Sequence, residues 1–162
     1  MSTPVLLARQ GQRLLQLGIA LILYSSLDGF VIPYLGSQRI GLSVHTLSAF
    51  QGVLLLALGL LWSRLRLTAT VARVAFWCLV YSTLAILAAY TVAAIWGVGV
   101  DTIRLMGELP HGLSRGTAGQ ETFIAILAYS SAPTGLASFG LILWGLRTEL
   151  HGNAGRDRSD HE

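Results

Sequence analysis

The sequence predicts an all-α membrane protein, a bundle of four transmembrane helices in antiparallel, up-down order with both termini in the cytoplasm. Three observations predict this class. Hydrophobic residues make up 53% of the 162 residues and charged residues only 12%, about half of the roughly 25% that soluble domains carry. Four apolar segments reach the roughly 20 residues that a helix needs to cross a bilayer. The few charges gather at the boundaries of these segments.

The first predicted span covers about residues 14–35. It is too long for the apolar part of a cleaved signal peptide and lacks a small-x-small cleavage site, so we expect a retained helix. Further spans follow at about 40–62, 71–98 and 122–146, and the third is long enough to tilt. The links YLGSQRI and SRLRLTAT are short, and only GVDTIRLMGELPHGLSRGTAGQE is long.

Residues 1–150 therefore form one transmembrane domain. Residues 151–162, HGNAGRDRSDHE, are polar and are expected to form a disordered tail. The single cysteine, Cys78, rules out an internal disulfide, and its place in the third span favours a packing role.

The arginines predict the orientation, because positive charge is enriched on the cytoplasmic side. Eight lie at the N-terminus, the second link and the tail, and three lie on the opposite side. The eight are Arg9, Arg13, Arg64, Arg66, Arg73, Arg147, Arg156 and Arg158, and the three are Arg39, Arg104 and Arg115.

The stretch GLSVHTLSAFQG places His45 inside the second predicted span. A charged side chain at the centre of a membrane helix costs about 2 kcal/mol or more, so His45 is a candidate functional residue. The other histidines lie in the long link (His111) and the tail (His151 and His161). A single axial histidine leaves one iron position of a haem open for a substrate, whereas an electron-transfer haem needs two facing histidines.

Other polar side chains are predicted at a similar depth. At 1.5 Å per residue, Asp28 lies about 10 Å and His45 about 8 Å from the outer ends of their helices. Tyr90 lies at a similar depth in the third span, Glu121 opens the fourth, and Tyr129 follows about two turns further in. All four helices thus contribute polar groups to one outer layer.

Each of these residues also has a structural alternative. Glu121 can be a first-turn acid that favours the helix dipole, and Tyr90 and Tyr129 can be interfacial or packing aromatics. Gln51 can hydrogen-bond a neighbouring helix. Asp28 can cap a helix that is broken by the glycine and proline that follow it.

Small residues follow His45 at helical spacing, since positions 48, 49, 52 and 59 hold Ser, Ala, Gly and Gly. Such a strip allows the close approach of another helix or of a flat ligand, and Gly52 is the candidate cofactor contact. Gln51 lies about 120° away from this face. It would border the site from the side or face a neighbouring subunit.

Three segments carry a resemblance to a known family: FVIPYLGSQRIGLSVHTLSAFQGVLLLALGLLW (residues 30–62), VAFWCLVYSTLAILAAYTVAAIWGVG (residues 74–99) and LILWGLR (residues 141–147). They resemble the hydroxylaminobenzene mutases, small four-helix membrane isomerases akin to styrene oxide isomerase. The resemblance covers most of the chain apart from the termini and the long link. Its most specific part is the pattern P-x-x-x-x-x-R-x-G-L-S-x-H with a following Q-G.

The resemblance implies the rearrangement of hydroxylaminobenzene to 2-aminophenol in the inner (cytoplasmic) membrane of a bacterium. It also implies a haem b between the subunits of a homotrimer, with His45 as the axial iron ligand and Gln51 facing the substrate. In the third span it implies an acid or tyrosine pair around Tyr81 and Tyr90 and an asparagine near position 85, where this chain has Ala85.

These expectations define a mechanism in which the iron acts as a Lewis acid and weakens the N–O bond. Asp28 or Glu121 would stabilise positive charge or take the ring proton, or Asp28 would orient His45 through its second ring nitrogen. The tyrosines and Gln51 would position the ring. The expected partners are a small aromatic hydroxylamine and lipid, without nucleic acid. Two alternatives stay open: an epoxide isomerase, or a non-enzymatic haem-binding or accessory membrane subunit.

Overall fold

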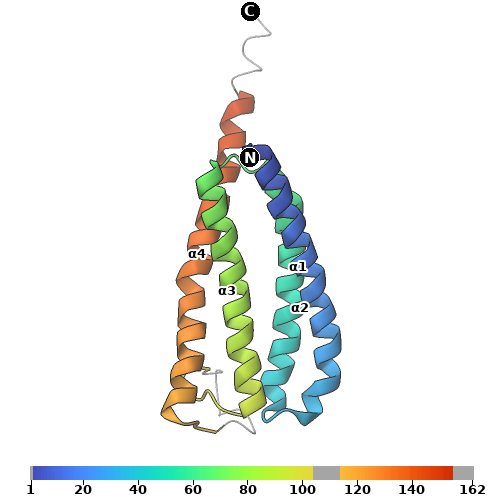
Figure 1. Cartoon of the computed structure of the whole chain (residues 1–162), viewed down its shortest axis with the longest axis vertical. Coiled ribbons are helices and arrows are strands. Elements are labelled where there is room, and N and C mark those ends of the chain that lie inside the picture. Colours follow the sequence, from blue (N-terminus) through green and yellow to red (C-terminus); the bar gives the residue numbers. More distant parts are fainter. Residues whose placement is uncertain (1, 104–113, 155–162) are drawn as a thin grey trace, which may run out of the picture.

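Four long helices make up the computed structural model of the chain, which describes residues 2–103 and 114–154. They are α1 (Thr3–Val31), α2 (Gln38–Leu61), α3 (Ala69–Trp96) and α4 (Ala118–Ala154), with the 3-10 turns η1 (Ile32–Tyr34) and η2 (Trp62–Arg64) after α1 and α2. All four are long and apolar enough to cross a membrane. The all-α prediction is confirmed, and the helices alternate in direction (Figure 1). The cytoplasmic placement of both termini stays a prediction.

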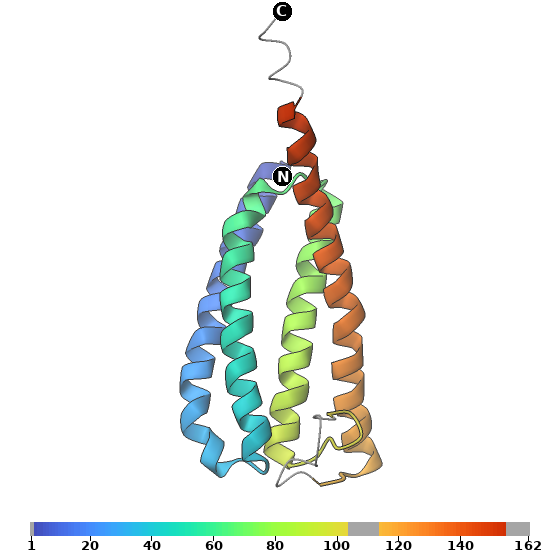
Figure 2. The same ribbon diagram turned by 180° about the vertical axis from the view of Figure 1, so that it is seen from behind.

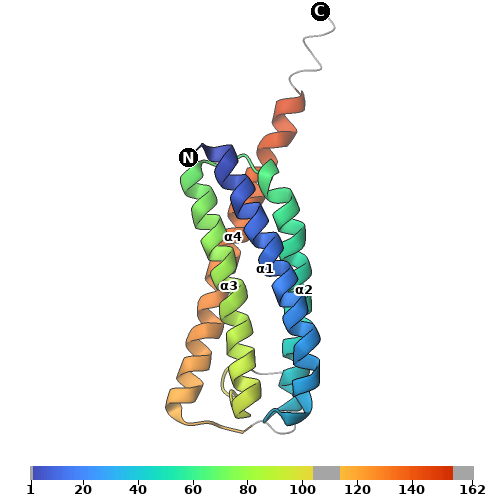
Figure 3. The ribbon, with the colours of Figure 1, turned by 45° about the vertical axis from the view of Figure 1, so that its right-hand side comes forward.

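The bundle consists of two helix pairs. Helix α1 packs along α2, and α3 packs along α4, while α2 and α3 join the pairs. Figures 1 and 2 show the two pairs from opposite sides. In Figure 3, α1 lies in front of the contact between α2 and α3. The ends of α1 and α3 and the starts of α2 and α4 meet at one end of the molecule (Figure 1). The predicted polar layer therefore belongs to one end of the bundle.

Glycines bring α1 and α2 into close contact. A Cβ atom on Gly11 would lie 2.8 Å from the carbonyl oxygen of Gly59, and one on Gly18 would lie 2.8 Å from that of Gly52. A Cβ on Gly52 would itself lie 2.7 Å from Cγ1 of Ile22. The strip of small residues below His45 thus serves helix packing. The contact of Gly52 with a cofactor stays a prediction that this packing does not support, because α1 lies where a side chain of Gly52 would point.

Helix α1 begins at Thr3 rather than near residue 14, with a proline in its first turn, where the missing N–H costs nothing. The additional turns are held by Gln10, which is 5% exposed. The indole of Trp62 donates a hydrogen bond to Oε1 of Gln10 at 3.1 Å, and Nε2 of Gln10 donates to the carbonyl of Ala72 at 3.5 Å. Gln10 interrupts the apolar pattern of the sequence, but in the structure it is buried, because Trp62 and Ala72 satisfy its polar atoms.

The other boundaries lie near their predicted positions. Helix α3 ends where Gly97 adopts a left-handed conformation with φ of 66°, a backbone shape that glycine adopts without strain. Helix α4 continues to Ala154, past the predicted domain boundary at Leu150. The rest of the predicted tail, 155–162, lies outside the described residues.

Candidate active site

His45 lies two turns into α2, opposite Ser25 of α1. Its Nδ1 atom is 2.9 Å from the carbonyl oxygen of Ser25. Because a carbonyl oxygen can only accept, Nδ1 carries the proton, and Nε2 of the neutral ring is then the nitrogen with a free lone pair. The hydroxyl of Ser25 donates to the carbonyl of His45 at 2.8 Å and lies 3.3 Å from Nδ1. One residue of α1 therefore fixes both the ring and the backbone of His45.

The surroundings of the ring leave Nε2 available as a ligand. His45 is half-buried, and no hydrogen bond to Nε2 forms within 2–103 and 114–146. Gly29 lies beside the ring, where a Cβ atom would be 3.6 Å from Cε1 of His45. Asp28 does not hydrogen-bond the ring, whose Nδ1 atom is bonded to the carbonyl of Ser25. The expectation that Asp28 orients His45 is therefore wrong, and Ser25 does so.

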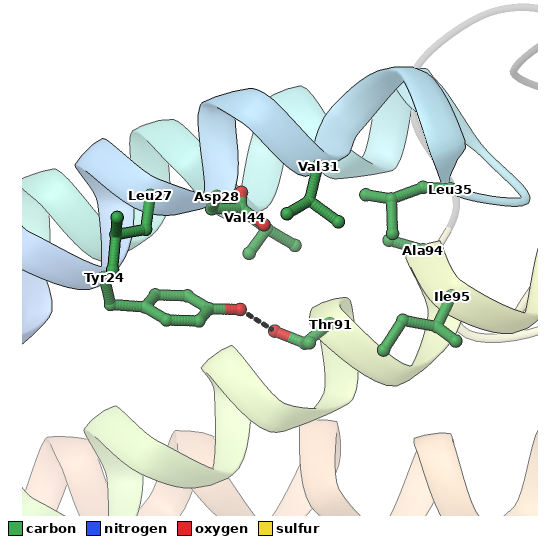
Figure 4. Close-up of a pocket in the computed structure, with 9 residues that line it drawn as sticks. All are labelled: Tyr24, Leu27, Asp28, Val31, Leu35, Val44, Thr91, Ala94 and Ile95. Atoms are coloured by element: carbon green, nitrogen blue, oxygen red, sulfur yellow. Dashed lines mark hydrogen bonds between the residues drawn. The ribbon is translucent and has the colours of Figure 1, made fainter.

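Asp28 instead lines a cavity between α1, α2 and α3, drawn in Figure 4. The cavity has a volume of about 210 Å³, and its walls are mostly apolar, including Val31, Val44 and Ile95. The side chain of Asp28 is 8% exposed, and its Oδ2 atom is buried without a hydrogen-bond partner among residues 2–103 and 114–146. At the edge of the cavity the hydroxyls of Tyr24 and Thr91 share a hydrogen bond of 3.3 Å. Asp28 caps no helix break, since α1 continues to Val31.

Gln51 and Tyr90 lie away from this cavity. Oε1 of Gln51 is buried and lacks a hydrogen-bond partner in the part of the chain that the structure describes. Tyr90 lines an open groove of about 520 Å³ between α2 and α3, together with Ser43 and Thr46 of α2. This groove holds polar groups from two helices, and Gln51 is not among the residues that line it. The positioning roles of Tyr90 and Gln51 stay predictions.

Two tyrosines belong to the other helix pair. The hydroxyl of Tyr81 lies 2.8 Å from Oγ of Ser130, which joins α3 to α4. The hydroxyl of Tyr81 is therefore directed toward α4 and not toward His45. Tyr129 is 66% exposed on α4, which packs on α3 and not on α1. Ala85, at the position where an asparagine was expected, is buried in α3.

Glu121 holds the link between α3 and α4. Its Oε1 atom accepts hydrogen bonds from the amides of Gly99 at 3.0 Å and Gly116 at 2.9 Å, and its Oε2 atom accepts from Asp101 at 3.4 Å. The side chain is 7% exposed. Glu121 therefore holds the link, and its catalytic role stays a prediction for which this geometry gives no support. Nearby, the hydrogen bond and the charge of Asp101 raise the pKa of Arg115 above its ordinary value.

Ser25, Tyr24 and Thr91 are site residues that sequence reasoning missed. Tyr24 and Thr91 are polar groups inside apolar spans, so a complete survey of intramembrane polar residues would have found them. The acceptor for His45, in contrast, is a backbone carbonyl, for which a sequence carries no signal.

The fold and this site, together with the proteins that the chain resembles, define a membrane isomerase. Residues 10–147 match the family model described as styrene oxide isomerase, and the chain belongs to this family. It is 42% identical over 146 residues to hydroxylaminobenzene mutase HabB of Ectopseudomonas oleovorans, covering 90% of this chain and 87% of that protein. It is 30% identical over 129 residues to hydroxylaminobenzene mutase HabA of the same organism, covering 80% and 93%. No solved structure matches.

Replacing Glu121 with alanine is expected to lower stability without removing the chemistry. Three backbone amides lose their acceptor, and each buried unsatisfied donor costs about 1–3 kcal/mol. Glu121→Gln keeps one acceptor oxygen and is expected to cost less. Thermal unfolding and isomerase turnover below the melting temperature measure the two effects separately. A large loss of kcat at an unchanged melting temperature would make Glu121 a catalytic residue after all.

Proposed function

We propose that the protein rearranges hydroxylaminobenzene to 2-aminophenol. The observation that carries this proposal is the 42% identity, over 90% of the chain, to a protein named hydroxylaminobenzene mutase. The reaction breaks the N–O bond, forms a C–O bond at the ortho carbon, and moves one proton from that carbon to nitrogen. Reactant and product are isomers, so no external oxidant or reductant is needed.

We propose His45 as the residue that would hold a haem b iron. Its geometry fits this role, because the bond from Nδ1 to the Ser25 carbonyl fixes the tautomer, orients the ring and makes Nε2 a better donor. A haem iron held by His45 would supply Lewis acidity to the N–O bond. His45 is only half-buried in a single chain. The resemblance implies a homo-oligomer, a trimer, in which a second chain would cover the exposed side of the ring.

Among the two candidate carboxylates, Asp28 remains available to stabilise positive charge on the aryl fragment or to accept the ring proton. Its Oδ2 atom has no partner, whereas both oxygens of Glu121 are bound by backbone amides. Tyr90 and Gln51 are proposed to position the ring and its oxygen. The apolar walls exclude water that would trap a cationic intermediate.

A second candidate function is epoxide isomerisation, which the description of the matching family model favours. Purified protein in lipid nanodiscs, supplied with hydroxylaminobenzene or with styrene oxide, separates the two. We expect 2-aminophenol to form with a kcat/KM at least tenfold above that for conversion of the epoxide to its aldehyde isomer. The reverse preference would favour the epoxide isomerase. Turnover of neither would contradict both and leave an accessory membrane subunit.

We further propose that the protein resides in the inner (cytoplasmic) membrane of a bacterium with both termini inside. This orientation is supported by the eight arginines at the N-terminus, the second link and the tail against three on the opposite side.

A further inference from the structure

The cavity between α1, α2 and α3 has the size of one small aromatic molecule. Its volume is about 210 Å³, and an apolar protein cavity of about 150 Å³ is large enough to bind benzene. The space therefore fits a single ring with one or two small substituents. Figure 4 shows Val31, Val44 and Ile95 around this space, with Asp28 on one wall.

Asp28 gives the cavity a chemical preference. The residue is 8% exposed, and its Oδ2 atom is buried without a hydrogen-bond partner. A buried carboxyl oxygen that lacks a donor is costly, because its desolvation is not repaid. A ligand with an N–H or O–H group would supply this donor, while the apolar walls would contact its ring.

The cavity also adjoins an open groove on the outside of the bundle. Tyr24 and Thr91 line both this cavity and an open apolar groove between α1 and α3, which has a volume of about 480 Å³. Their shared hydrogen bond of 3.3 Å crosses from α1 to α3 at the boundary between the two spaces. An aromatic molecule dissolved in the bilayer would reach Asp28 from the groove when this bond opens.

We propose that the cavity is a binding site for a single-ring aromatic molecule with an N–H or O–H donor, which Asp28 accepts. His45 is not among the residues that line the cavity, but Val44, the residue before it, is. That the bound ring is the arylhydroxylamine substrate or the aminophenol product rests on the proposed function. The binding itself does not.

The test compares phenol with toluene, which differ in the presence of one donor. Affinities are measured by titration calorimetry on the full-length protein in nanodiscs, and the heat from empty nanodiscs is subtracted. The absorption spectrum is recorded in parallel, so that binding of phenol to a haem iron is distinguished from binding in the cavity. We expect phenol to bind at least tenfold more tightly than toluene, about the factor that a hydrogen bond to a charged group contributes. In Asp28→Leu this preference is expected to fall below threefold while toluene still binds.

Two further variants assign the binding to this cavity. Val31 is 48% exposed, so Val31→Phe fills the cavity without forcing a larger side chain into the core, and it is expected to weaken phenol and toluene at least tenfold. Ser26→Ala is the control, because Ser26 is exposed and bonds only within its own helix, to Ile22. It is expected to change neither affinity. Equal affinities of wild-type protein for phenol and toluene, or phenol binding that survives both Asp28→Leu and Val31→Phe, would overturn the proposal.

Kinetics separate this proposal from the proposed function. A raised KM for hydroxylaminobenzene in Val31→Phe, with loss of phenol binding, identifies the bound ring with the substrate. Phenol binding without any turnover in the wild type would contradict the proposed function alone. Turnover with an unchanged KM and unchanged phenol binding in Val31→Phe would contradict the cavity site alone.

Discussion

Replacing His45 with alanine is expected to abolish haem retention and to lower isomerase turnover at least a thousandfold. The imidazole supplies the lone pair of Nε2, in the tautomer that the bond from Nδ1 to the Ser25 carbonyl fixes, and no other histidine is predicted within a span. The ratio of Soret to protein absorbance and the yield of 2-aminophenol measure the two losses. Exogenous imidazole is expected to restore part of both, because the alanine leaves space beside Gly29.

Ser26→Ala is the control for this variant. Ser26 follows Ser25 directly and is exposed, and its hydroxyl donates to the carbonyl of Ile22 of the same helix. The substitution is expected to leave haem content and turnover within twofold of the wild type. Haem retention and full turnover in His45→Ala would show that the chemistry rests on other groups, with Asp28 the first among them.

Replacing Gly52 with leucine is expected to separate α1 from α2 and to give the largest loss of stability. A Cβ atom at this position would lie 2.7 Å from Cγ1 of Ile22 and 2.9 Å from the carbonyl oxygen of Gly18. The carbonyl oxygen of Gly18 is fixed by the helix and cannot rotate away as a side chain can, so α1 and α2 must move apart. Overpacking costs about 1–3 kcal/mol, and at the upper end this corresponds to a fall of roughly 6–12 °C in melting temperature.

The same substitution at Gly140 is the control, because a Cβ atom there would meet nothing within 4 Å. Gly140→Leu is expected to keep or raise the melting temperature, since leucine favours a helix over glycine. His45 and Ser25 lie along the same contact between α1 and α2 as Gly52, so Gly52→Leu is also expected to lower haem content. Equal melting temperatures for the two variants would contradict the close packing of α1 on α2.

The sequence predicted the helices well because length and hydropathy are local properties. Four apolar runs of membrane length can only be satisfied as helices, whose backbone groups bond internally. The start of α1 was missed because Gln10 interrupts the apolar pattern. Its burial depends on Trp62 and Ala72, which lie 52 and 62 residues away, and no local pattern contains that information.

The site was predicted in part for a similar reason. His45 and Asp28 stood out because ionisable groups inside a span are costly. The neighbour that each side chain faces depends on which helices pack together. The spacing of residues along the sequence does not determine this packing. The strip of small residues predicted that either a helix or a ligand packs against Gly52, and in the structure α1 packs there. Glu121 has the chemistry of a catalytic acid, but the amides of the link engage it.

The most direct measurement of the proposed reaction is the mass of 2-aminophenol formed from hydroxylaminobenzene labelled with ¹⁸O in its hydroxyl group, in unlabelled water. Intramolecular transfer predicts that the product retains the label almost completely, because the oxygen moves from nitrogen to carbon within an enclosure that excludes water. A product whose oxygen comes from water would contradict intramolecular transfer. The absence of any 2-aminophenol would contradict the proposed function itself.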